Sequence, residues 1–401
     1  MESPLANKTF RLLWASWLVA HMCLWMNDVG AAWTMTALSG DPFLVALVQT
    51  ASTLPIFVLG LPVGALADRL DRRRFFAFTQ WWAAVVAALL ALTHALGLLT
   101  PTLLLALVLA NGIGLAMRMP VFAALVPSAL PREQLRPAIA MTSIAANVAR
   151  IAGPLVAGAL LAAAGPFSVY ALNAVLCSAT ALLLTRWKFT PAPRPAPPPY
   201  FQAIAEGARY AWRSPMMRLI LTHSTVFFFQ GIVVIALLPV IASSMHDAGP
   251  AGYGMLLAGM GTAAIATGMA ITRLSRQLGL QNLIRIARVA HACGTLLAGF
   301  APNLWLAVFG MMLTGFGWVA AGNSWSATLQ LRLPDEVRAR GMSIYQMAVM
   351  GSCAGGAALW GQVVSLTSLH TGLLCAVLVA AVLLLFTHRF KLPPLERGVT
   401  T

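Results

Sequence analysis

The sequence predicts an all-α integral membrane protein with twelve transmembrane helices in two pseudo-symmetric six-helix bundles. Of its 401 residues, 59% are hydrophobic and 9% are charged, whereas soluble domains carry about a quarter charged residues. Apolar stretches of twenty or more residues recur, each long enough to cross a hydrocarbon core of about 30 Å. In lipid the backbone must satisfy its own hydrogen bonds, so stretches of this length are expected to be helices.

Each expected span is bounded by Gly, Pro or charged residues. The twelve spans are expected at approximately residues 11–38, 43–67, 75–99, 102–126, 138–164, 167–187, 216–243, 252–274, 281–300, 303–328, 341–367 and 370–388.

The 26 Lys and Arg residues predict the orientation. All except Arg118 and Arg150 lie in the amino terminus, in five alternate loops with their flanking turns, or in the carboxy tail. The intervening loops contain none. The positive-inside rule therefore places both termini in the cytoplasm. This pattern also explains the net charge of +15 without a nucleic-acid partner.

A proline-rich segment at 190–199 divides the chain. It is expected to be an extended connector, followed by a helix at the cytoplasmic surface over 200–212. We therefore expect an amino-terminal bundle over 1–188, a cytoplasmic linker with a surface helix over 189–215, and a carboxy-terminal bundle over 216–401.

The two halves also share residues at one offset, 203 positions apart. The matches are Gly112, Gly114, Leu130, Pro131, Glu133, Gly153 and Gly158 with Gly315, Gly317, Leu333, Pro334, Glu336, Gly356 and Gly361. Both halves begin on the same side and have an even number of spans. They are therefore predicted to be parallel repeats, related by an axis along the membrane normal.

The charged loop between the second and third spans carries a family resemblance. Its sequence resembles the loop signature of the major facilitator superfamily at Gly64, Asp68, Arg69, Arg72 and Arg73, with Asp71 where many members have Gly. More narrowly, the chain resembles the bacterial branch that contains the enterobactin exporter and macrolide efflux proteins. The stretches that support this branch are residues 65–74, 147–154, 253–257 and 340–345.

The resemblance implies that this loop is a conformational latch. Asp68 would interact with the start of helix 11 near Gly341, and with nearby arginines, on the cytoplasmic side. A carboxylate at a helix amino end is favourable by up to about 1 kcal/mol. The alternative is a purely topogenic loop, a role that the arginines alone could fill.

Asp28 is the only acidic residue deep within a span. A charge at the bilayer centre costs at least about 3 kcal/mol, so an ionisable group there is a functional candidate. The resemblance implies a role in coupling, since a first-helix acid in related drug exporters couples proton entry to substrate exit. The alternative is a structural pair with an arginine. Arg150 matches Asp28 better in height, whereas Arg118 lies on helix 4, which faces the cavity in the family. Either arginine could instead contact an anionic substrate.

Gly153, Pro154 and Gly158 resemble the antiporter signature of proton-coupled exporters, although Ala157 departs from it. Ordinary tight helix packing is the alternative. Other polar residues could line a central pocket: His21, Gln49, His223, Gln230, Asn323 and Gln346. Aromatic walls could come from Trp25, Trp33, Phe227, Phe228, Trp318 and Trp325.

These features predict a secondary active transporter of the bacterial cytoplasmic (inner) membrane. The favoured function is proton-coupled export of an amphipathic small molecule, such as a siderophore or drug, by alternating access. The alternatives are an importer or facilitator of a metabolite or lysophospholipid and, more remotely, a membrane-embedded enzyme or receptor. We expect a monomer that binds its substrate, protons and lipid, with no catalytic residues, metal, cofactor or nucleic acid.

Overall fold

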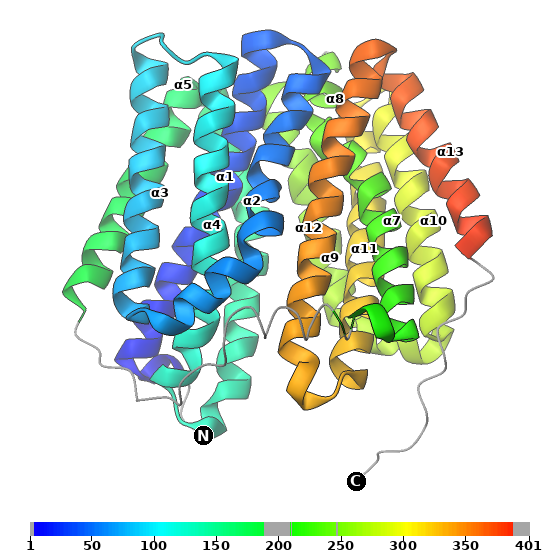
Figure 1. Cartoon of the computed structure of the whole chain (residues 1–401). Helices are drawn as coiled ribbons and strands as arrows, with labels where there is room; N and C mark the ends of the chain where they lie inside the picture. Colours follow the sequence, from blue (N-terminus) through cyan, green and yellow to red (C-terminus); the bar gives the residue numbers. More distant parts are fainter. Residues whose placement is uncertain (1–3, 188–208, 210, 246–247, 388–401) are drawn as a thin grey trace.

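The computed structural model describes residues 4–187, 209, 211–245 and 248–387. Within these residues the chain is helical, without strands (Figure 1). Most of the expected linker over 189–215, with its proline-rich connector and surface helix, lies outside the described residues.

The first half contains a 3-10 turn over Pro4–Ala6 and five long helices. They are α1 (Lys8–Ser39), α2 (Pro42–Arg69), α3 (Arg72–Ala95), α4 (Pro101–Ala129) and α5 (Arg132–Arg186). Side chains cap several of them, and Asn7 accepts hydrogen bonds from the amides of Thr9 and Phe10 at the start of α1. The α5 helix is interrupted at Gly165, whose φ of 73° only glycine adopts readily. This break falls where the sequence predicts the loop between the fifth and sixth spans.

The second half contains seven helices among the described residues. They are α7 (Pro215–Ala236), α8 (Leu238–Ser244), α9 (Gly249–Leu278), α10 (Leu280–Gly299), α11 (Leu304–Arg332), α12 (Asp335–Leu366) and α13 (Leu369–Thr387). The expected single span over 216–243 is divided, because Leu237 leaves the helical conformation just before Pro239. A proline there cannot donate the amide hydrogen bond that would continue α7.

Eight helical stretches among the described residues are long and apolar enough to cross a membrane. If α5 is divided at Gly165 and α7 with α8 is taken as one crossing, the helices follow the twelve expected spans in order. The number of crossings itself stays a prediction.

The helices form two side-by-side groups (Figure 1). In the first group α1 and α3 pack against α5, and α2 packs against α4. In the second group α10 and α9 pack against α11, and α7 packs against α12. The main contacts between the groups are α2 with α12 and α5 with α9.

The repeated glycines lie at equivalent helix contacts, which gives the repeat a structural meaning. Gly112 on α4 approaches the backbone of α2, as Gly315 on α11 approaches α9. Gly114 lies against α3, as Gly317 lies against α10. A side chain at any of these positions would meet atoms closer than 3 Å. Pseudo-symmetry therefore follows from shared requirements for close backbone approach.

Two further pairs complete this correspondence. Gly153 packs on α1, and its repeat partner Gly356 packs on α7. Gly158 crosses to α9 in the other group, and its partner Gly361 crosses to α2. The repeated glycines therefore make corresponding helix contacts both within each group and between the groups.

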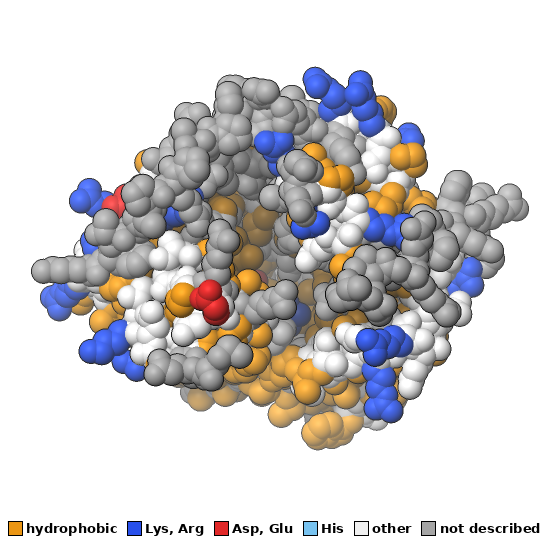
Figure 2. Space-filling view, turned by 90° about the horizontal axis from the view of Figure 1, so that it is seen from below, with side chains coloured by type: hydrophobic (Ala, Val, Ile, Leu, Met, Phe, Trp, Pro, Cys, Tyr) orange, Lys and Arg blue, Asp and Glu red, His pale blue; other side chains and the backbone are white. Residues whose placement is uncertain are grey.

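The groups touch on one face and diverge on the other. Gly158 and Gly361 contact the first turns of α9 and α2, at Pro250 and Pro42. These turns lie at the upper end of the molecule, opposite the start of α1 (Figure 1). Seen from below, the surface is hollowed between the two groups, and Lys and Arg side chains are spread over the surrounding face (Figure 2). The chain is therefore open toward the face where α1 begins and closed at the opposite face.

Candidate functional site

Asp28 lines a small cavity where the two helical groups meet. The cavity has a volume of about 30 Å³. Its walls come from α1, α2, α7 and α9, and they comprise Trp25, Asp28, Ala32, Val45, Val48, Gln49, Ser52, Ile235, Ala236, Tyr253 and Leu257. Asp28 therefore faces the junction between the groups.

The partner of Asp28 is a hydroxyl group. Ser52 Oγ donates a hydrogen bond to Asp28 Oδ1 over 3.2 Å. Tyr253 of the other group forms part of the same wall, and its ring stacks with that of Trp33 at a centroid distance of 6.1 Å. The carboxyl group is thus hydrogen-bonded within the first group and shares its cavity with residues of the second.

Neither arginine pairs with Asp28. Among the described residues, which include all three side chains, no ion pair joins Asp28 to Arg118 or Arg150. The alternative of a structural pair between Asp28 and an arginine therefore has no support among these contacts. The two arginines instead lie against different faces of α1.

Arg118 points into the interior of the first group. It is 4% exposed, and its Nη1 donates to the Ala20 carbonyl oxygen over 3.3 Å. With Asn27, Asn111 and Asn173 it lines a pocket of about 10 Å³ between α1, α3, α4 and α5. This placement favours a role in packing that bundle.

Arg150 lies on α5 beside the junction. Its guanidinium carbon is 5.7 Å from the centroid of the Trp25 ring, a cation–π distance. Its Nε is buried without a hydrogen-bond acceptor. Trp25 also lines the Asp28 cavity, so both charged residues have Trp25 as a neighbour.

The residues of the glycine–proline motif contact two different helices, α1 and α9. A Cβ at Gly153 would lie 2.7 Å from Trp25 Cβ, so this glycine seats α1 on α5. A Cβ at Gly158 would lie 3.1 Å from Gly254 Cα, and a Cβ at Gly254 would lie 2.7 Å from the Pro154 carbonyl oxygen. Pro154 and Gly158 therefore form the crossing of α5 with α9.

The charged loop is described only in part. Gly64, Asp68 and Arg69 belong to the end of α2, but their side chains lie outside the described part of the chain. Gly341 on α12 packs against Leu333 and Met217 of its own group. The latch between Asp68 and Gly341 stays a prediction.

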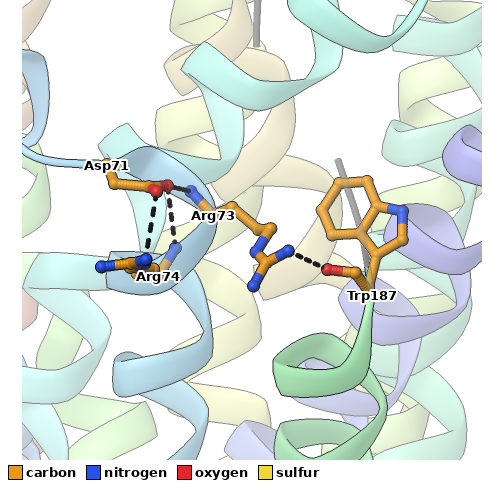
Figure 3. Close-up of polar contacts among 4 residues, drawn as sticks. All are labelled: Asp71, Arg73, Arg74 and Trp187. Atoms are coloured by element: carbon orange, nitrogen blue, oxygen red, sulfur yellow. Dashed lines mark hydrogen bonds and ion pairs between the residues drawn. The ribbon is translucent and has the colours of Figure 1, made fainter. Parts of the chain in front are cut away.

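Asp71 and Arg73 have local roles (Figure 3). Asp71 Oδ1 accepts hydrogen bonds from the amides of Arg73 and Arg74, which caps α3. Asp71 Oδ2 lies 3.6 Å from Arg74 Nε in an exposed ion pair. Arg73 Nη1 donates to the Trp187 carbonyl oxygen, tying the start of α3 to the end of α5. Asp71, where many relatives have Gly, is thus a helix cap.

The predicted polar residues of the second group lie apart from Asp28. Gln230 is 8% exposed, and its Oε1 has no hydrogen-bond partner. It lines a largely apolar pocket of about 190 Å³ between α7, α10 and α13, together with Arg288 and His291. His223 is buried on α7, and its Nε2 has no partner. The structure does not bring Gln230 into the cavity of Asp28.

The remaining predicted residues are dispersed. His21 is partly buried, and its Nδ1 lies 3.0 Å from the Trp17 carbonyl oxygen. Asn323 on α11 and Gln346 on α12 are exposed. Gln49 lines the Asp28 cavity, as expected for a pocket residue.

The predicted aromatic residues form two sets. Trp25 and Trp33 lie at the Asp28 cavity or beside it. The other four pack on one another inside the second group around His291: Phe227, Phe228, Trp318 and Trp325. Of these, Trp325 is fully buried. This second set is core packing.

The sequence did not reveal that Ser52 donates a hydrogen bond to Asp28 or that Tyr253 lines the same cavity. A serine within an apolar span carries no signal of its own, and Tyr253 stood out only in a family-like stretch. Their relation to Asp28 depends on the rotation of α2 and on the contact between the groups. No group of three or more metal-ligating side chains occurs within the described ranges.

The chain matches the family described as transmembrane secretion effectors, MFS_3, over residues 2–400. It is 22% identical to a staphyloferrin A transporter of Staphylococcus aureus, over 65% of this chain and 66% of that protein. It is also 22% identical to macrolide efflux protein A of Streptococcus pyogenes, over 63% of this chain and 65% of that protein. The matched region thus spans just under two thirds of these two relatives. An enterobactin exporter of Citrobacter koseri is 24% identical over 97% of this chain and 94% of its own length.

Solved structures have the same fold. A crystal structure of the nucleoside transporter NupG superposes with a TM-score of 0.83 at 15% identity, covering 95% of this chain and all of that one. A bacterial homologue of the lysosomal transporter Spinster gives a TM-score of 0.78 at 14% identity, covering 99% and 100%. The family match over residues 2–400 shows that the chain belongs to the transmembrane secretion effector family, within the major facilitator superfamily of membrane transporters.

Proposed function

We propose that the protein is a proton-coupled exporter of an amphipathic small molecule, and that Asp28 is its proton-binding residue. The position of Asp28 carries this proposal. It is the only acid within the expected spans, and residues of both helical groups enclose it. A group at this junction experiences any relative movement of the two groups.

The cavity around Asp28 suits a neutral carboxyl group. The cavity is narrow, about 30 Å³, and Asp28 is partly buried in it. An ionised carboxylate favours fuller solvation or a counter-ion, and Ser52 supplies one hydrogen bond only. Protonation of Asp28 would therefore favour closure of the upper face, and ionisation would favour its opening.

This coupling gives a transport cycle by alternating access. We place the lower face, which carries Lys and Arg side chains, in the cytoplasm, in accordance with the positive-inside rule (Figure 2). A proton taken up from outside would let the upper face close and reopen the cytoplasmic cleft. Release of that proton inward and binding of substrate would then drive the opposite movement. The Gly158 and Gly361 crossings are the contacts that separate in this step.

The relatives support the substrate class. Proteins named as a staphyloferrin A transporter, a macrolide efflux protein and an enterobactin exporter are siderophore or drug transporters by their names. We propose a substrate of the same general kind, moved outward through the bacterial inner membrane by a monomer.

The test is the Asp28→Asn variant in reconstituted vesicles. A panel of dyes, macrolides and siderophores is first screened for proton-gradient-driven transport by the parent protein. For each transported compound, Asp28→Asn is expected to abolish gradient-driven accumulation while retaining exchange between equal concentrations. Asp41→Asn is the matched control, because Asp41 lies in a loop and the amide can still accept the Phe43 hydrogen bond.

Two outcomes would contradict the proposal. Gradient-driven transport by Asp28→Asn at the parent rate would remove Asp28 from coupling. Accumulation in the direction opposite to export would favour the importer instead.

A further inference from the structure

We infer that the exported molecule carries an anionic group, and that Arg150 binds it through its guanidinium. This inference rests on the proposed transport function and adds the charge of the substrate to it. The observation that carries it is a permanent cation at the junction between the groups without a carboxylate partner.

The lack of a partner follows from the inventory of acids. Asp28 is the only acidic residue within the expected spans, and its carboxyl group is bonded to Ser52. In the described part of the chain Arg150 forms no ion pair, and its guanidinium group lies against the Trp25 ring. The Arg150 side chain is partly buried, and its Nε has no hydrogen-bond acceptor. A bound anion would supply the missing charge.

Arg150 also lies at a suitable depth. At 1.5 Å per residue, Trp25 and Arg150 lie roughly 26 and 27 Å from the starts of α1 and α5, near the middle of each span. A Cβ at Gly261 on α9 would lie 3.3 Å from the Arg150 carbonyl oxygen. Arg150 therefore belongs to the part of α5 that contacts α9, where the two groups converge.

The surroundings of Arg150 add aromatic and basic character. His21, Trp25 and Asp28 are spaced four and three residues apart, so they share one face of α1. The site therefore combines the planar guanidinium of Arg150 with the Trp25 ring and a histidine. Asp28 lies about one helical turn further along α1.

Arg118 is the weaker candidate for the same role. It is enclosed by α1, α3, α4 and α5 in a pocket of about 10 Å³, smaller than any organic substrate. Its guanidinium already donates to the Ala20 carbonyl oxygen. The substrate chemistry that fits Arg150 is a carboxylate, sulfonate or similar anion attached to an aromatic or apolar body. A planar anion accepts two parallel hydrogen bonds from such a fork.

The experiment uses two fluorescent probes with the same apolar body. One is 8-anilino-1-naphthalenesulfonate, an anion, and the other is N-phenyl-1-naphthylamine, which lacks the sulfonate. Equilibrium dialysis against the full-length protein in lipid nanodiscs, corrected with empty nanodiscs, gives both affinities. The parent is expected to bind the anion about tenfold or more tightly than the neutral probe.

The Arg150→Gln variant is expected to lose this preference through weaker anion binding, by about tenfold or more, with unchanged affinity for the neutral probe. Arg150→Lys keeps the charge and loses the planar fork. Its preference for the anion is expected to lie between those of the parent and Arg150→Gln. It replaces Arg150→Gln in the test if the glutamine variant does not fold. Arg218→Gln removes the same charge from an exposed position and is expected to behave as the parent.

The inference is overturned if the parent binds neither probe, if it shows no preference for the anion, or if Arg150→Gln keeps the full preference. It is also overturned if Arg218→Gln loses as much as Arg150→Gln, because the preference would then reflect net charge alone. Binding at equilibrium requires no proton gradient. Anion binding that depends on Arg150, in a parent protein that shows no gradient-driven export, would therefore uphold the anion site and reject the proposed coupling.

Discussion

The crossing of α5 with α9 provides the sharpest mechanical test of alternating access. In the present conformation Gly158 and Gly254 bring the two backbones into contact. A methyl group introduced by Gly158→Ala would lie 2.9 Å from the Pro250 carbonyl oxygen and 3.1 Å from Gly254 Cα. Both are backbone atoms, so the clash cannot be relieved by rotating a side chain.

The expected magnitude follows from overpacking. Forcing one extra methyl group into a tight contact typically costs about 1–3 kcal/mol. That energy penalises only the state in which the upper face is closed, so it shifts the equilibrium between conformations by roughly 5- to 150-fold. Gly361→Ala, at the pseudo-symmetric crossing, should act similarly, because its Cβ would lie 2.4 Å from Ala46 Cβ.

The assay is a distance measurement between spin labels on the upper face. Cysteines introduced at the exposed ends of α1 and α8, by Ser39→Cys and Ser244→Cys, carry the labels after the accessible Cys293 and Cys375 are replaced with serine. Gly158→Ala is expected to increase the population with a longer distance.

Gly268→Ala is the matched control on α9, because no atom lies within 4 Å of its added methyl group. It should leave the distance distribution unchanged. If Gly158→Ala and Gly361→Ala also leave it unchanged while the proteins remain folded, these crossings do not hold the upper face closed, and the packing argument is refuted.

Two further predictions concern stability, both measured by thermal unfolding in detergent. Asp71→Ala removes the cap of α3 and is expected to destabilise the protein by about 1 kcal/mol. Asp71→Asn keeps an acceptor for the Arg73 and Arg74 amides and should change the stability little. Equal losses of stability in both variants would contradict the capping role. His291 lies 3.1 Å from each of the Gly231 and Thr314 carbonyl oxygens, so His291→Ala is expected to cost about 2–4 kcal/mol through a cavity and lost hydrogen bonds. The exposed His370→Ala is its control, and a similar stability of the two variants would show that the His291 contacts contribute nothing.

The sequence predicted the helical class and most helix positions because the bilayer imposes length and polarity on each span. The break at Gly165 was also predictable, since glycine and proline mark a turn between two apolar runs. The division of the seventh span at Leu237 was not, because one proline near the end of an apolar run is compatible with a continuous helix.

The repeat offers the clearest case of a signal whose meaning needed the fold. The sequence shows that Gly158 corresponds to Gly361, but either could pack within its own bundle. The structure places both at contacts between the groups, whereas Gly153 and Gly356 serve contacts within them. Spacing along the chain carries no information about which neighbour a helix face meets.

The sequence by itself determined that Asp28 is the only acid in the membrane-spanning part of the chain and that the family is that of membrane transporters. Only the tertiary structure decided that Ser52 and Tyr253 surround Asp28, that Arg118 faces a bundle interior, and that Arg150 stands at the junction without a carboxylate. Composition fixes which groups must leave water. The rotation and crossing of helices, set by contacts far apart in sequence, fix which of those groups meet.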